Sequence, residues 1–166
     1  GQVDAEILTP AEYARAMSML DDEPDRRLAE ARQVALILGY RCGLRRGEIR
    51  RLLLRDLQGL YEPALAFPTL VVRGNRFGST KTSNANRVLS LWALLDRKST
   101  RLNRRWYRRR TLEQTSKKRN QLFLCELHQP NFLMPSKALI DPVQDAMRIA
   151  SGTPGLSFHN LRHSCA

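Results

Sequence analysis

The last ten residues of this chain read Ser157-Phe158-His159-Asn160-Leu161-Arg162-His163-Ser164-Cys165-Ala166. His159 and Arg162 are three residues apart, so on a helix both side chains point the same way. Histidine can carry a proton near neutral pH, and arginine is a planar cation whose five donors suit a phosphate. We therefore expect this stretch to supply half of a phosphate site that the rest of the fold completes.

A second stretch far upstream supplies the other half, Cys42-Gly43-Leu44-Arg45-Arg46-Gly47-Glu48. Arg45 lies at or just before the start of a predicted helix, a location that favours an anion. Planar guanidinium groups can each grip two oxygens of a phosphate. Two arginines and a histidine brought together by the fold would therefore make a site for a phosphodiester.

Composition limits the kind of protein that this can be. At 166 residues the chain is most simply one domain, and 42% apolar residues are enough for a packed core. No apolar run is long enough to cross a bilayer, and the N-terminus does not resemble a signal peptide. Cys42, Cys125 and Cys165 are widely spaced and odd in number, which indicates free thiols in a reducing compartment. We expect a cytoplasmic, nucleoid-associated protein without metal or other cofactor and without a membrane partner.

The positive charge of the chain is concentrated in one segment. The formal net charge is +12, which favours a polyanionic partner such as nucleic acid. Residues 97–119 hold eleven basic residues and one acid, a net charge of +10, and the remainder of the chain carries only +2. Like charges one helical turn apart repel each other, so this segment favours contact with DNA phosphates over a merely solvated helix. Trp106 and Tyr107 within it are more typical of core anchors than of base-stacking residues.

Helix signals cover most of the chain. Thr9 and Glu12 around Pro10 form a capping box that starts a helix to about residue 20, and Gly43 is a natural left-handed cap for the next helix. The predicted helices are about 10–20, 26–40, 46–56, 92–95 continuing through the basic segment, 142–151 with Asp141 as its cap, and a last helix with His159.

Strand chemistry occupies the middle of the chain. Apolar and β-branched residues predict a strand over 64–73, two short strands over 79–82 and 87–91 around a turn at 83–86, and a further strand at 122–125. Residues 128–135 are typical of a loop. The fold class is therefore α+β and mainly helical, with a small antiparallel sheet at one edge and Lys81 near a hairpin tip.

Three motifs in this order resemble those of the tyrosine recombinase (phage integrase) family. Cys42 to Ile49 resembles its first arginine box, and Phe158 to Ala166 resembles its second box, His-x-Leu-Arg-His. Between them, the segment Ser79 to Leu91 is similar to the lysine hairpin of the family. Each motif alone is weak, but the three together span residues 42–166 and are specific.

The resemblance implies a role for each motif residue. Arg45 and Arg162 would clamp the scissile phosphate, and His159 would donate a hydrogen bond or handle a proton. Lys81 would protonate the leaving 5′ oxygen, which suits an ammonium group on a flexible stem. Glu48 and His163 would support these residues from behind, Glu48 by an ion pair. The cations supply the charge that a metal would otherwise supply.

Positive side chains around these motifs are the candidates for contact with double-stranded DNA. They are Arg73, Arg76, Arg87, Arg101, Arg104, Arg105 and Arg108.

The chain departs from the family pattern at both ends. The nucleophilic tyrosine of the family follows the second box, whereas Tyr13, Tyr40, Tyr61 and Tyr107 all precede it. Only about forty residues precede the first box, so the core-binding domain that clamps DNA is not expected within this sequence. We expect a catalytic-domain fragment of a DNA breaking-and-joining recombinase that is inactive alone and monomeric in solution. The alternative is a non-catalytic DNA-binding module or a decayed integrase remnant with the same fold.

Overall fold

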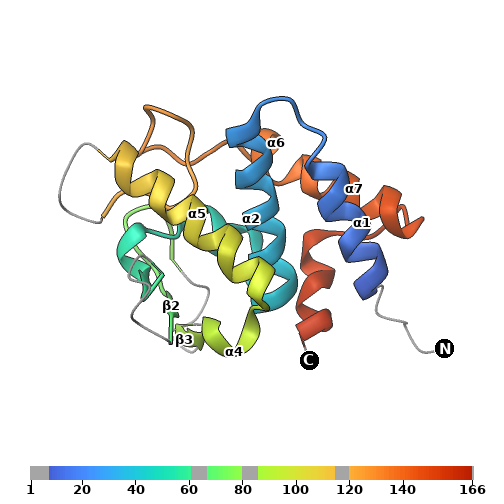
Figure 1. Cartoon of the computed structure of the whole chain (residues 1–166), viewed down its shortest axis with the longest axis horizontal. Helices are drawn as coiled ribbons and strands as arrows, with labels where there is room; N and C mark the ends of the chain where they lie inside the picture. The colour runs from blue at the N-terminus through green and yellow to red at the C-terminus, as the bar shows by residue number, and fades with distance from the viewer. Residues whose placement is uncertain (1–7, 61–66, 80–85, 115–119, 166) are drawn as a thin grey trace. The chain divides into compact units, whose positions relative to one another are not determined.

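The computed structural model describes residues 8–60, 67–79, 86–114 and 120–165, with only the backbone described for 162–165 (Figure 1). It divides into two compact units. Unit 1 comprises Gly1–Arg46 and Pro135–Ala166, and unit 2 comprises Gly47–Met134. Two compact units can belong to one domain, so the single domain expected from the length stays a prediction.

Unit 1 is entirely helical in its described part. Helices α1 and α7 lie side by side, α6 packs on α7, and α2 packs against the 3-10 helix η3 (Figure 1). Their bounds are α1 Pro10–Leu20, α2 Arg26–Cys42, α6 Ser136–Leu139, α7 Asp141–Ser151 and η3 Phe158–Cys165.

The ends of the unit 1 helices follow the local sequence signals. The predicted capping box starts α1, since the Thr9 side chain accepts from the backbone of Glu12 and the Glu12 side chain accepts from the Thr9 backbone. Gly43 ends α2 in the left-handed conformation with φ 70°. The predictions for the first two helices are confirmed. Helix α7 is also confirmed, with Ile140 in place of Asp141 as its N-cap.

Unit 2 contains a three-stranded antiparallel sheet in the order β1-β2-β3, in which Leu57 pairs with Leu70 and Leu70 with Leu89. The elements of this unit are α3 Arg46–Arg51, η1 Leu54–Asp56, β1 Leu57–Gln58, β2 Thr69–Val72, β3 Arg87–Ser90, α4 Leu91–Leu94 and α5 Arg97–Glu113. The small sheet in a mainly helical chain confirms the predicted fold class.

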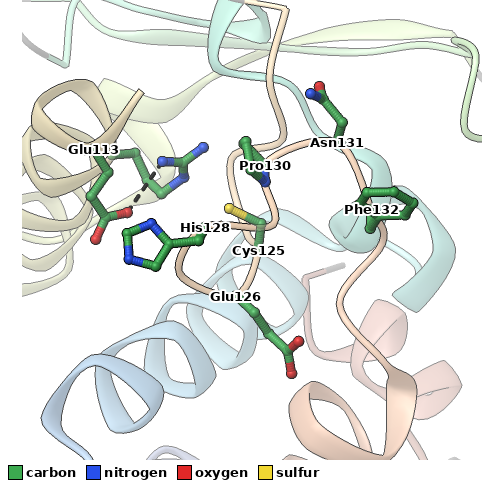
Figure 2. Close-up of a pocket in the computed structure, with 8 residues that line it drawn as sticks. Glu113, Cys125, Glu126, His128, Pro130, Asn131 and Phe132 are labelled. Atoms are coloured by element: carbon green, nitrogen blue, oxygen red, sulfur yellow. Dashed lines mark hydrogen bonds and ion pairs between the residues drawn. The ribbon is translucent and has the colours of Figure 1, made fainter. Parts of the chain in front are cut away.

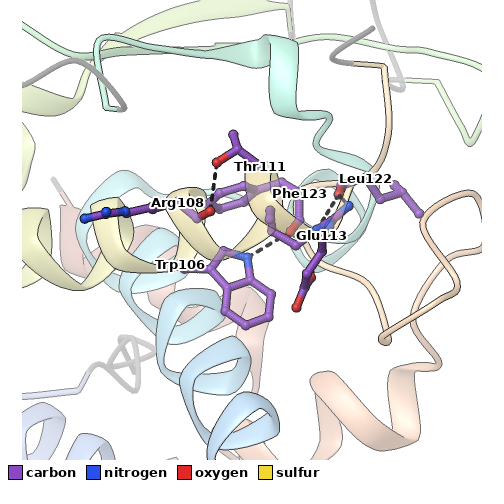
Figure 3. A network of polar contacts seen from close by, with 7 residues as sticks. Trp106, Arg108, Thr111, Glu113, Leu122 and Phe123 are labelled. Atoms are coloured by element: carbon purple, nitrogen blue, oxygen red, sulfur yellow. Dashed lines mark hydrogen bonds and ion pairs between the residues drawn. The ribbon is translucent and has the colours of Figure 1, made fainter. Parts of the chain in front are cut away.

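Helix α5 is fixed in unit 2 by two buried side chains that bind the chain segment after it (Figure 3). Trp106 Nε1 donates to the Phe123 carbonyl at 2.8 Å. Arg110 donates twice to the Leu122 carbonyl, from Nε at 3.1 Å and from Nη2 at 2.8 Å. Trp106 is fully buried and Tyr107 is 1% exposed, which confirms that both anchor the core.

Two predictions fail where the same segment pairs with another part of unit 2. The helix expected over 46–56 ends at Arg51, and the strand expected over 122–125 is a single bridge between Leu53 and Leu122. Backbone bonds of Leu54 N to Gln121 O and Phe123 N to Leu52 O, at 2.9 and 2.8 Å, replace further helical bonds. Tertiary pairing therefore overrides the helical pattern of these leucines.

Three further differences concern short elements. Strand β1 and helix α6 were not predicted, and the helix with His159 is a 3-10 helix. The strand expected over 64–73 is confirmed only at 69–72, and that over 87–91 is confirmed as β3. Of the strand expected over 79–82, only Ser79 belongs to the described residues, and it lies outside any strand.

Candidate functional site

Close packing in unit 1 holds the second arginine box against helix α2. A Cβ atom placed on Gly39 would lie 2.5 Å from Phe158 Cε1 and 2.9 Å from Leu161 Cδ1. Such distances are far below van der Waals contact, so only glycine allows η3 to approach α2 this closely. His159 lies in the chain between those two anchors and is itself exposed, so η3 presents it at the surface while its neighbours pack on α2.

The first arginine box leaves the same end of α2. After the left-handed Gly43, the Leu44 amide donates back to the Leu38 carbonyl at 3.2 Å, and the Leu44 side chain is fully buried. This bond folds the chain back against the last turns of α2, and the half-buried Arg45 is the next residue. The structure thus brings Arg45 and the His159 segment to one end of one helix, within unit 1.

The start of η3 is fixed by side-chain caps. Asn160 Oδ1 accepts from the Ser157 amide at 2.8 Å and from Ser157 Oγ at 3.0 Å. The Phe158 amide donates to Gln144 Oε1 of α7 at 2.9 Å. In a 3-10 helix, residues three apart eclipse each other. The backbone of η3 therefore places residues 159 and 162 on one side.

Some predicted site residues lie outside the described part of the structure. Lys81 belongs to the gap at 80–85, and the side chains of Arg162 and His163 are not described. Their roles stay predictions. Arg45 precedes a helix of only six residues, so helix α3 adds little field for an anion.

Glu48 of α3 makes a two-pronged ion pair with Arg87 of β3. Arg87 Nη1 and Nη2 donate to the two carboxylate oxygens at 2.9 and 3.1 Å. The Glu48 side chain is 3% exposed and that of Arg87 is 29% exposed. This ion pair ties β3 to the helix that follows the first box, and the expected support of the Arg45 cluster by Glu48 stays a prediction.

A second arginine expected on DNA also has a buried acid as partner. Arg73 Nε donates to Asp56 Oδ1, and Arg73 Nη2 lies 2.8 Å from the same oxygen. The other carboxylate oxygen, Asp56 Oδ2, accepts from the Leu53 amide. Arg76 is exposed, bonds Asn131 Oδ1 at 3.1 Å and lies over the Phe77 ring. These contacts give Arg73 and Arg87 a structural role, and contact of these three arginines with DNA stays a prediction.

Unit 2 also contains a hollow of about 330 Å³ that the sequence did not predict (Figure 2). Its lining comprises Arg110, Glu113, Cys125, Glu126, His128, Pro130, Asn131 and Phe132. Each guanidinium nitrogen of Arg110 already makes a hydrogen bond, since Nη1 donates to Glu113 at 3.2 Å and Nε and Nη2 donate to the Leu122 carbonyl. Of the sequence-predicted site residues whose side chains the structure describes, none lines this hollow.

The described residues offer neither a metal-ligand cluster nor a membrane-spanning helix. They contain no group of three or more His, Cys, Asp or Glu side chains placed to hold a metal ion. Their helices include none that is long and apolar enough to cross a membrane.

Comparison with solved structures shows what this fold resembles. The XerH site-specific recombinase bound to its difH substrate matches with a TM-score of 0.61 and 17% identity over 95% of this chain. The XerA recombinase matches with a TM-score of 0.61 and 15% identity over 99% of the chain. The chain therefore has the fold of these recombinases. The Tn1549 transposon integrase in complex with transposon right end DNA also has it, with a TM-score of 0.58 and 19% identity over 99% of the chain.

The likeness concerns the fold and part of each larger protein. The chain covers 40% of XerH, 50% of XerA and 53% of the integrase, about half of each. No family model and no curated protein matches the sequence. The resemblance based on three motifs is therefore supported at the level of the recombinase fold.

One residue of the candidate site was missed by sequence reasoning. Gly39 sits inside helix α2, where a glycine costs about 1 kcal/mol relative to alanine. An interior helical glycine often marks close packing. That unexplained glycine, three residues before the first box, was the available signal for where the second box packs.

Proposed function

We propose that this chain is the catalytic region of a site-specific DNA recombinase or integrase, which binds duplex DNA and activates one phosphodiester. Arg45 and Arg162 grip the non-bridging oxygens of the scissile phosphate. His159 supplies a hydrogen bond or a proton at the same group. Lys81 protonates the departing 5′ oxygen. Glu48, held by Arg87, stiffens the segment that follows Arg45.

The observation that carries this proposal is the contact of Phe158 and Leu161 with Gly39. It is a long-range contact in unit 1 between the second box and helix α2, whose end leads directly into the first box. A fixed array of cationic donors stabilises the charge that gathers on a phosphate during in-line attack. The DNA substrates of the structurally similar XerH and Tn1549 proteins favour the same partner for this chain.

The proposal assigns no nucleophile among the tyrosines of this sequence. Tyr13 and Tyr107 are buried, and all four tyrosines precede the second box. The attacking tyrosine of the cleavage step therefore lies outside the roles that we give to residues 1–166.

The joining half of the reaction tests the proposal without that tyrosine. The substrate is a nicked duplex whose 3′ phosphate carries a 4-nitrophenyl ester in place of the tyrosyl group, next to a free 5′ hydroxyl. The 5′ hydroxyl gives its proton to Lys81, the reverse of the transfer in cleavage, and its oxygen forms the new bond to phosphorus. The aryl P–O bond breaks, and 4-nitrophenolate leaves with the electron pair. The chain should accelerate release of nitrophenolate and produce sealed strand.

Arg45→Ala and Arg46→Ala make a matched pair for this assay, because the two residues are adjacent and Arg46 is exposed. Loss of one preorganised donor typically lowers the rate by about 10²–10³-fold, so Arg45→Ala should do so. Arg46→Ala should retain the rate. Equal rates for the two variants, or DNA binding without any sealing, would favour a DNA-binding module over an enzyme.

A further inference from the structure

Helix α5 has two sharply different faces along its described length. Its buried face comprises Ser99, Asn103, Trp106, Tyr107 and Arg110. Its exposed basic residues are Arg97, Lys98, Arg101, Arg105 and Arg108. At about 100° per residue, the four arginines of the second set fall within about 80° of one another, opposite the buried set. We call these four the α5 arginine face.

The same structure separates this face from the other arginines of the helix. Arg110 is 1% exposed and engaged with the Leu122 carbonyl and Glu113. Arg104 is half-buried, and its Nε is enclosed without a hydrogen-bond partner. Figure 3 shows the Arg108 side chain pointing in a different direction from the Trp106 ring. Burial, which the sequence could not supply, thus distinguishes arginines that hold the fold from those that face solvent.

We propose that the α5 arginine face binds the phosphate backbone of double-stranded DNA without reading its sequence. From residue 97 to 108 the face extends about 16 Å along the helix axis, at 1.5 Å per residue. Each DNA strand presents one phosphate per about 3.4 Å of axis, so this length matches about five phosphates of one strand. The inference rests on the proposed function, because the duplex that α5 binds is the DNA substrate proposed for the chain.

Charge complementarity determines the choice of partner. Arginines on adjacent turns repel one another, and within α5 the sole acidic residue is Glu113, which is bonded to the buried Arg110. A dense line of phosphates neutralises such a row. The only large apolar side chain on the same side is Leu112, beyond the last arginine, so α5 lacks the continuous apolar face of a membrane-surface helix.

The test compares two triple variants that remove the same charge. Arg97→Gln, Arg101→Gln and Arg108→Gln together remove three members of the face. Arg26→Gln, Arg55→Gln and Lys137→Gln together remove three exposed cations that lie outside α5. The affinity of each chain for a short labelled duplex of arbitrary sequence is measured by fluorescence anisotropy over a range of NaCl concentrations.

The expected result is a change in salt dependence confined to the first variant. Each phosphate contact contributes about −0.9 to the slope of log affinity against log salt, so three lost contacts should reduce its magnitude by about 2.7. The control variant should change the slope by less than about 1. Without DNA, the first variant should melt at the same or a higher temperature, since repulsion is relieved.

Three outcomes would overturn the inference. They are an equal slope change in both triple variants, a lower melting temperature for the first variant without DNA, and tighter binding of the unmodified chain to phosphatidylserine vesicles than to duplex. The sealing assay distinguishes this failure from failure of the proposed function. If the unmodified chain seals the nick but the first triple variant has the same salt slope as the unmodified chain, only the inference is refuted. If the unmodified chain neither binds DNA nor seals the nick, the proposed function is refuted.

Discussion

Replacing Gly39 by alanine tests the packing that brings the two arginine boxes together. The new Cβ would lie 2.5 Å from Phe158 Cε1, whereas carbon atoms in contact are about 3.5–4.0 Å apart. Helix η3 or the Phe158 ring must therefore move by about 1 Å. Overpacking of this kind costs about 1–3 kcal/mol, while the better helix propensity of alanine returns about 1 kcal/mol.

Because the Phe158 ring is buried and the approach is as short as 2.5 Å, the overpacking cost should fall in the upper half of that range, about 2–3 kcal/mol. The net expectation is then a loss of about 1–2 kcal/mol, or a fall of about 2–8 °C in melting temperature for a chain of this size. Thermal unfolding followed by circular dichroism measures it. Gly47→Ala is the matched control, because the nearest atom to its new Cβ is the flexible Arg51 Nη1 at 3.4 Å. That variant should be neutral or more stable.

A double variant locates the effect at the contact itself. Phe158→Leu shortens the side chain that the new Cβ meets, so the losses from Gly39→Ala and Phe158→Leu should be less than additive by about 0.5–3 kcal/mol. Additive losses, or equal melting temperatures for Gly39→Ala and Gly47→Ala, would refute the reasoning that η3 is seated on Gly39.

Three further predictions concern unit 2. Arg87→Ala removes the guanidinium group that pairs with the buried Glu48 carboxylate and should lower the free energy of unfolding in urea by about 2–4 kcal/mol. The loss is smaller than for a fully buried pair because Arg87 is partly exposed. A loss below about 0.5 kcal/mol would mean that the pair is a surface one. Trp106→Phe removes the donor to the Phe123 carbonyl inside the core and should cost about 2–4 kcal/mol in the same assay, and unchanged stability would argue against that bond. Asn75→Ala loses one bond within a tight turn, from the Phe77 amide, and one that ties the turn to the last carbonyl of α3 at 2.7 Å, and it should cost about 1–2 kcal/mol. Faster amide exchange confined to this turn is expected, and exchange that is unchanged there would contradict the prediction.

Local signals predicted the elements that depend on local chemistry. The capping box at Thr9, the left-handed cap at Gly43 and the alternating residues of β3 all form the structures that their sequence indicates. Each of these depends on interactions within a few residues, which a sequence displays directly.

The failures occur where distant backbone decides the outcome. Leu52 and Leu54 continue a helical pattern, but their backbone groups bond to the segment at 121–123. The sequence showed a density of arginines around α5, but it could not show which of them are buried. Arg110 is enclosed and Arg108 is exposed, although both belong to the same run.

The candidate site was predicted in part for the same reason. The sequence motifs identified Arg45 and His159, and the structure shows that the segments containing them meet helix α2 near its C-terminal end. Neither motif spelling nor periodicity selected Gly39, because its importance comes from a ring that arrives from residue 158.

The most direct test of whether Arg45 and His159 share one phosphate site is a titration of the chain with inorganic phosphate. The NMR signals of its three histidine imidazoles are monitored during the titration. His159 should shift on addition of phosphate in the unmodified chain and in Arg46→Ala, and the shift should be lost in Arg45→Ala. His128, which lies in unit 2, serves as the internal reference. A His159 shift that persists unchanged in Arg45→Ala would contradict the claim that these two residues share one phosphate site.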